Sequence, residues 1–140
     1  MLSLLFSAFC VGCGGENVQI SGKVTYSDGK PMPGGVICFD NGQTSAIGRI
    51  KDNGTYTLGS LKARDGIPPG PYNVYFINTQ LLETDPQSGI SKNVELVSPK
   101  FKRSATSGLK YEVMGRATGV DFTVDYPTQT GFLETPIAEG

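Results

Sequence analysis

The chain has 140 residues with 12 basic and 13 acidic side chains, which gives a formal net charge of −1. A balance this close to neutral argues against nucleic acid or an anionic membrane surface as the main partner, because both attract a surplus of Lys and Arg. The sequence contains no histidine, so an ordinary catalytic zinc site and a Ser-His-Asp arrangement are both excluded.

The N-terminal segment has the pattern of an export signal. An apolar run from Leu2 to Val11 ends in Gly12-Cys13-Gly14-Gly15. The run is too short to cross a bilayer, which takes about 20 apolar residues. A short apolar stretch suits a signal peptide, and a small residue followed by cysteine at the cleavage point suits a bacterial lipoprotein. An ordinary cleaved signal is the alternative.

We therefore expect residues 1–12 to be a lipoprotein signal peptide, Cys13 to be the lipidated residue and residues 13–17 to form a tether. Cys10 is a poorer acylation site, because Phe9 would stand where a small residue is needed. The segment departs from the usual lipoprotein signal in two ways: Cys10 stands where leucine is usual, and the run has no Lys or Arg before it. The acyl anchor on Cys13 predicts a protein of the cell envelope, bound to a bacterial membrane and facing the periplasm or the exterior. The outer membrane or cell surface is favoured, since Gly14 is not the aspartate that retains many lipoproteins in an inner membrane.

If Cys10 leaves with the signal and Cys13 is acylated, Cys38 is the one thiol left in the mature chain. No internal disulfide is then possible. Without a histidine to act as its base or a second thiol to share a metal, Cys38 is expected to be a buried strand residue.

Beyond residue 17 the chain alternates apolar and polar residues between turn signals, without a segment of helical period. Strands are expected at residues 18–26 and 35–39. The Asn53-Gly54 turn predicts that residues 46–51 and 55–58 pair as a hairpin. After the Ile67-Pro68-Pro69-Gly70 loop, residues 72–78 are expected to form a central strand, and a terminal hairpin is predicted from the two remaining ranges, residues 109–113 and 120–126.

These strands predict an all-β fold, a seven-stranded sandwich over residues 18–126. Residues 79–107 are expected to be a long connection outside the core, with one weak strand candidate at 93–97. Residues 127–140 are expected to be a C-terminal tail with little apolar periodicity.

Several motifs carry a family resemblance. They are Gly22-Lys23-Val24-Thr25-Tyr26, Asp28-Gly29-Lys30-Pro31, the hairpin from Asp52 to Leu58 and the run from Asp65 to Val74. In this order they resemble the carboxypeptidase regulatory-like, or transthyretin-like, domain. With Ser98-Pro99-Lys100-Phe101 and Thr106-Ser107-Gly108-Leu109 they resemble a group of small bacterial lipoproteins built on it. The resemblance implies an exported, lipid-anchored, prealbumin-like (Ig-like) β-sandwich and brings no catalytic residue with it.

The residues offer no convergent catalytic set, and no cofactor or metal is expected. A carboxylate pair is conceivable among five acidic residues, most of which turn formation or a solvent-facing strand position explains: Asp40, Asp52, Asp65, Asp121 and Asp125. Lys100, Lys102 and Arg103 surround Phe101, a cluster that could contact an anionic glycan or protein or could be a solvated loop anchored by one buried ring. Tyr75 and Tyr111 could offer rings to a sugar if they face outward.

We therefore expect a non-catalytic, membrane-anchored structural or protein-interaction module that contacts an envelope protein or glycan. A carbohydrate- or peptide-binding module is the alternative, and a hydrolase is the least supported class.

Overall fold

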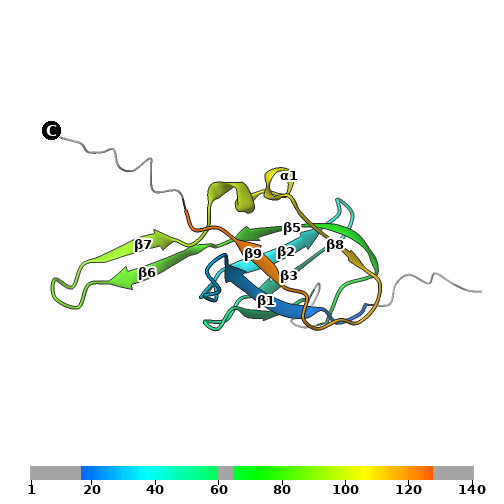
Figure 1. Ribbon diagram of the computed structural model, residues 1–140, viewed down its shortest axis with the longest axis horizontal. Coiled ribbons are helices and arrows are strands. Elements are labelled where there is room, and N and C mark those ends of the chain that lie inside the picture. The colour runs from blue at the N-terminus through cyan, green and yellow to red at the C-terminus, as the bar shows by residue number, and fades with distance from the viewer. Residues whose placement is uncertain (1–16, 60–64, 128–140) are drawn as a thin grey trace, which may run out of the picture.

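A computed structural model describes residues 17–59 and 65–127, and nearly all of their regular structure is β-strand (Figure 1). The expected all-β class is confirmed. The strands of the described ranges are β1 (Ser21–Tyr26), β2 (Val36–Asp40), β3 (Ser45–Arg49), β4 (Thr55–Thr57), β5 (Gly70–Ile77), β6 (Gln80–Thr84), β7 (Ser91–Glu95), β8 (Leu109–Val113) and β9 (Phe122–Val124). Two short helical turns follow β7: the 3-10 turn η1 (Pro99–Lys102) and α1 (Ser104–Ser107).

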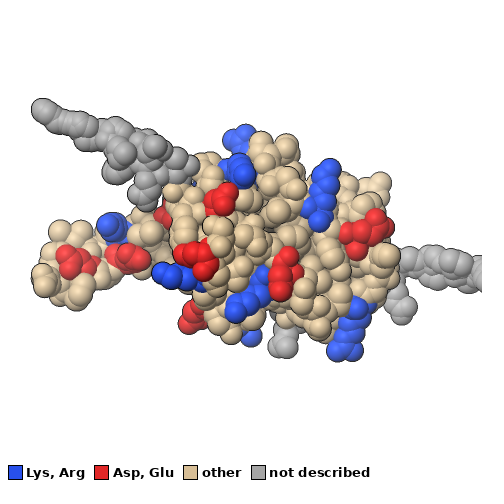
Figure 2. All heavy atoms as spheres, viewed as in Figure 1, with Lys and Arg blue, Asp and Glu red and all other residues tan. Residues whose placement is uncertain are grey.

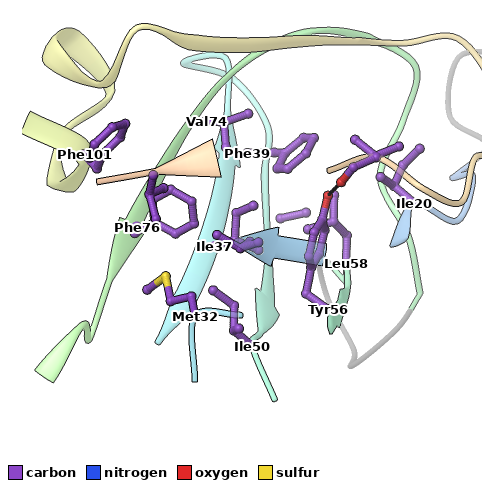
Figure 3. Close-up of a cluster of buried hydrophobic side chains, with 14 of the residues drawn as sticks. Ile20, Met32, Ile37, Phe39, Ile50, Tyr56, Leu58, Val74, Phe76 and Phe101 are labelled. Atoms are coloured by element: carbon purple, nitrogen blue, oxygen red, sulfur yellow. Dashed lines mark hydrogen bonds between the residues drawn. The ribbon is translucent and has the colours of Figure 1, made fainter. Parts of the chain in front are cut away.

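Two sheets enclose one hydrophobic core. The strand order is β4-β1-β9 in the first sheet and β3-β2-β5-β8 in the second. Ile37, Phe39 and Phe76 of the second sheet are fully buried and belong to the same cluster as Tyr56 of the first (Figure 3). Val24 of the first sheet is a further member of this cluster. Burial of each such side chain contributes about 1.5–3 kcal/mol. In strands such as β3 and β5, the alternating apolar residues therefore point into the core and the residues between them point away from it.

The strands predicted at residues 35–39 and 72–78 are the two central strands of the larger sheet, because β2 lies between β3 and β5, and β5 lies between β2 and β8. Cys38 of β2 is a buried free thiol, as predicted. Its neighbours in register are Ile47 and Tyr75. Burial raises the pKa of the Cys38 thiol to about 11, so the thiol is neutral and unreactive at physiological pH.

The hairpin predicted from residues 46–51 and 55–58 is wrong in its pairing. The turn forms, with Gly54 at φ +86° and the Gly54 amide bonded to the Lys51 carbonyl at 2.7 Å. However, β3 pairs with β2, whereas β4 pairs with β1 in the other sheet. The two segments are joined by an isolated bridge between Ile47 and Gly59 and by the hydrogen bond from the Lys51 amide to the Thr55 carbonyl at 2.9 Å, not by a continuous ladder. The turn reverses the chain, but the burial of the strand residues decides which sheet each strand enters.

The predicted terminal hairpin is also wrong. β8 pairs antiparallel with β5, and β9 pairs parallel with β1. The segment between them crosses from one sheet to the other along the start of β1: the Ala117 amide bonds to the Gln19 carbonyl and the Val120 amide to the Ser21 carbonyl, each at 3.0 Å. These backbone bonds guide a crossover in place of a turn.

The crossover lies directly against Gly22 of β1. A Cβ added at position 22 would come within 1.9 Å of the Val120 carbonyl oxygen. The buried Tyr56 hydroxyl donates a hydrogen bond to that same oxygen at 2.6 Å (Figure 3). Only glycine therefore lets β1, β4 and the entry to β9 meet.

Residues 79–107 were expected to form a long connection outside the core, and this expectation is wrong for part of the segment. It contains β6 and β7, paired with each other as a separate two-stranded sheet. It then returns to the sandwich, where Leu96, Val97 and Phe101 join the core cluster. The described residues thus hold two strands more than the seven predicted.

Replacing Gly22 by alanine should lower the free energy of unfolding by at least about 2 kcal/mol, because the new methyl group overlaps the Val120 carbonyl and backbone must move. The midpoint of urea unfolding, followed by circular dichroism, measures the change. Gly115→Ala is the matched control, since a Cβ there meets nothing within 4 Å, and it should be within about 0.5 kcal/mol of wild type. Equal midpoints for the two variants would contradict the close approach.

Candidate interaction surface

The predicted cluster of Lys100, Phe101, Lys102 and Arg103 lies on η1 and the residue that follows it. The Phe101 ring is 4% exposed and belongs to the core. The Lys100 ammonium lies 4.9 Å from the centre of that ring. One buried aromatic therefore anchors the segment to the sandwich.

Two of the three cations in this cluster face carboxylates of the same chain. Lys102 pairs with Glu95 at 2.9 Å, and Lys100 lies 3.8 Å from Asp125. Arg103 is exposed, and its backbone carbonyl accepts hydrogen bonds from the first turn of α1. The cluster is thus partly neutralised from within, and its contact with a partner stays a prediction.

Charge on the visible face is mixed, with basic and acidic side chains interleaved (Figure 2). Among the residues that the structure describes, no three His, Cys, Asp or Glu side chains are grouped so as to hold a metal ion. Helices long and apolar enough to span a membrane are likewise not found in that part of the chain. Cys13, the predicted lipidation site, lies outside the described residues.

The two candidate sugar-stacking tyrosines have different surroundings. Tyr111 packs edge-on against Phe39, with ring centres 6.1 Å apart, and contributes to the border of the core. It also lines a shallow hollow of about 450 Å³ with Tyr72 and Lys110. Tyr75 is half-buried in register with Cys38, outside the core cluster. Neither ring is a fully exposed flat platform.

Three of the candidate carboxylates have contacts within the chain. Asp121 accepts a hydrogen bond from the Lys23 amide at 2.9 Å, and Asp40 accepts one from the Gly42 amide at 3.3 Å. Asp125 is the exposed partner of Lys100. A turn contact of Asp40, a strand contact of Asp121 and a surface ion pair of Asp125 account for these three side chains.

The most distinctive surface feature is the arm formed by β6 and β7, residues 80–95, which projects from the end of the sandwich (Figure 1). It continues the direction of β5 beyond Asn78, which adopts φ +50°, a left-handed conformation that asparagine tolerates better than most residues. Leu82 and Ile90 on the arm are 68% and 67% exposed. Among the described strands, β6 and β7 pair only with each other. A two-stranded sheet of this kind with exposed apolar side chains is suited to contact another molecule.

The tip of the arm is ordered by a polar turn. The Asp85 carboxylate accepts hydrogen bonds from the Gln87 amide at 2.9 Å and the Ser88 hydroxyl at 3.0 Å. Both hydrogen bonds lower the pKa of Asp85, and the one from the Gln87 amide has the larger effect. Gly89 takes φ +74° and donates its amide to the Asp85 carbonyl at 2.8 Å. The turn therefore fixes the register of the two strands.

The base of the arm is clamped to the sandwich from both sheets. The Tyr26 hydroxyl of β1 donates to the Leu96 carbonyl at 2.8 Å, and the Tyr26 ring stacks on Tyr126 with centres 3.8 Å apart. On the other side, Glu95 accepts hydrogen bonds from the buried Thr79 hydroxyl and from Lys102. The arm thus leaves the core at a fixed position.

The environment of Glu95 favours its ionised form. Partial burial disfavours the charge, but hydrogen bonds from Thr79 and Lys102 outweigh that effect and lower the pKa of Glu95. Glu95 therefore stays ionised and holds η1 against the arm at neutral pH.

The strand β6, and hence the arm, is not among the elements predicted from the sequence. The run Asp85-Pro86-Gln87-Ser88-Gly89 is a turn signal that could have revealed it, because Asp and Gly at these positions favour a reversal. The short Gln80–Thr84 strand offered little alternation, since both of its faces are largely exposed.

Comparison of the chain with protein-family models, with curated proteins and with solved structures finds no match in any of the three.

Replacing Glu95 by glutamine should lower the melting temperature at pH 7 by a few degrees, because a partly exposed ion pair contributes at most about 1 kcal/mol. The folded pKa of Glu95 is lowered, so its stabilisation is fully present above about pH 4.5 and is lost as the pH falls through the folded value. The difference in melting temperature between wild type and Glu95→Gln should therefore shrink in acid. Glu112→Gln, an exposed change on β8, is the control, and a difference independent of pH would contradict the clamp.

Proposed function

We propose that this protein is a non-catalytic lipoprotein of the bacterial cell envelope that displays a β-sandwich as a protein-interaction module. The observation that carries the proposal is the projecting arm, which exposes Leu82 and Ile90. Within residues 17–59 and 65–127, no further strand pairs with the outer edges of β6 and β7. A globular protein normally protects such edges. A free, ordered edge on a clamped support is what a contact surface requires.

The position of the arm fits an anchor at Cys13. The first described residues enter the sandwich at the end opposite the arm (Figure 1), where the Val18 amide bonds to the Ile67 carbonyl at 2.9 Å. A tether of residues 13–17 spans at most about 17 Å. The sandwich would therefore lie close to the bilayer, with the arm directed away from it.

The seven strands of the two packed sheets are compatible with the transthyretin-like domain that the sequence motifs resemble, with the arm as an insertion between β5 and β8. The proposed relationship rests on the order of the motifs from Gly22 to Val74 and on this strand count. It implies a scaffold for display, in which function comes from added surface features.

The proposal predicts that the arm makes the protein's contacts in cells. A double change, Leu82→Lys with Ile90→Lys, should abolish the crosslinked species that the full-length protein forms in intact bacteria, because it places two charges on the contact surface. Crosslinking followed by electrophoresis and mass spectrometry measures this loss.

Two controls accompany that experiment. Met114→Lys changes an apolar side chain that is 78% exposed and lies outside the arm, and it should leave the crosslinks intact. Cys13→Ser tests the anchor, and the variant should lose both incorporation of a fatty-acid analogue and sedimentation with membranes. Unchanged crosslinks in the arm variant would refute the interaction role, and undiminished fatty-acid labelling of Cys13→Ser would refute the anchor.

A further inference from the structure

The outer edge of β6 presents a regular set of backbone groups that no other strand of the described ranges pairs with. The Leu96 amide bonds to the Thr79 carbonyl at one end of the arm, and the Asp85 amide to the Ile90 carbonyl at the other, both at 2.8 Å. Bonded pairs alternate with non-bonded pairs in an antiparallel ladder. With the observed register, Gln80, Leu82 and Thr84 therefore direct their N–H and C=O groups away from β7.

The side chains at these positions leave the edge open. The Thr84 hydroxyl is 2.7 Å from the Ser91 hydroxyl on β7. The side-chain amide of Gln80 donates to the Glu95 carboxylate, also on β7, at 3.4 Å. Leu82, between them, has its side chain 68% exposed. The edge thus offers hydrogen-bonding groups around one apolar residue.

We propose that this edge pairs with β6 of a second copy of the chain, antiparallel and with the two-fold axis at Leu82. This partner assignment rests on the proposed interaction role of the arm. In this register Leu82 faces Leu82 of the second copy, so that each covers the other, and Gln80 faces Thr84. The strand is therefore complementary to itself, as a symmetric dimer requires.

Charge is compatible with the same register. Glu83 lies opposite Leu81 of the second copy, and its own arm places Lys92 across from it on β7. No two like charges are therefore directly opposed, an arrangement that would destabilise the pairing. Self-pairing through β7 is less favourable, because an axis at Asn93 brings no apolar side chains together.

The contact is small, well below the roughly 1,200 Å² of a stable interface. Self-pairing in dilute solution should therefore be weak. Two chains on one membrane meet at a much higher effective concentration, so the dimer should form on the membrane surface.

Disulfide trapping in intact cells expressing the full-length chain tests the register. Residues directly opposite in a bonded antiparallel pair have Cα atoms about 5.5 Å apart, within the range that a disulfide bridges. Leu82→Cys should therefore shift from monomer to dimer on a non-reducing gel, and the shift should disappear with reductant. The unmodified chain gives the background of the native cysteines.

Thr84→Cys is the matched control, because it lies on the same strand and the same face. In the proposed register its two copies lie about 14 Å apart along the strands, so this variant should remain monomeric. Both positions are exposed, and neither change disturbs the core.

A monomeric Leu82→Cys variant, equal trapping of both variants, or trapping at Asn93→Cys in place of Leu82→Cys would each overturn the self-pairing. The first result combined with loss of crosslinks in the double lysine variant would leave the interaction role standing with a different partner. The first result combined with unchanged crosslinks in that variant would refute both proposals.

Discussion

The close approach of β1 to the crossover before β9 is the constraint on which the sandwich depends. Gly22 lets the Val120 carbonyl lie where a side chain would otherwise stand, and Tyr56 binds that carbonyl from β4. This contact joins β1, β4 and the entry to β9 on the face of the smaller sheet that closes the core over β2 and β5. A side chain at position 22 would push this crossover away from β1, and the crossover leads directly into the β9 strand that pairs with β1.

The arm follows from the same closure. With β9 paired to β1, Tyr126 reaches the ring of Tyr26, and the Tyr26 hydroxyl holds the backbone at Leu96. The larger sheet supplies the opposite contact, since Thr79 directly follows β5 and Asn78 and bonds to Glu95. The arm therefore owes its fixed exit to both sheets, although β6 and β7 contact neither sheet as a paired strand.

The features predictable from sequence were local. Alternation located the central strands, the lack of a base or second ligand marked Cys38 as a core residue, and Asn53-Gly54 marked a turn. Which sheet each strand enters could not be predicted, because it depends on contacts between distant segments, such as that of Gly22 with Val120. The pairing of Lys102 with Glu95 could not be predicted for the same reason, since it depends on how η1 folds back against the base of the arm.

The two-sheet body is built around the core cluster, whereas Leu81 is the arm residue that packs against that cluster. The clamps at the base fix where the arm leaves the body, but the arm itself should open independently of the body. Amide hydrogen exchange on the full-length chain tests this most directly. The bonded amides of β6 and β7 should exchange through local opening, at a lower free energy than those of β2 and β5, which should exchange only on global unfolding. Equal protection of the arm and the central strands would contradict the claim, as would arm amides that exchange as fast as an unstructured peptide.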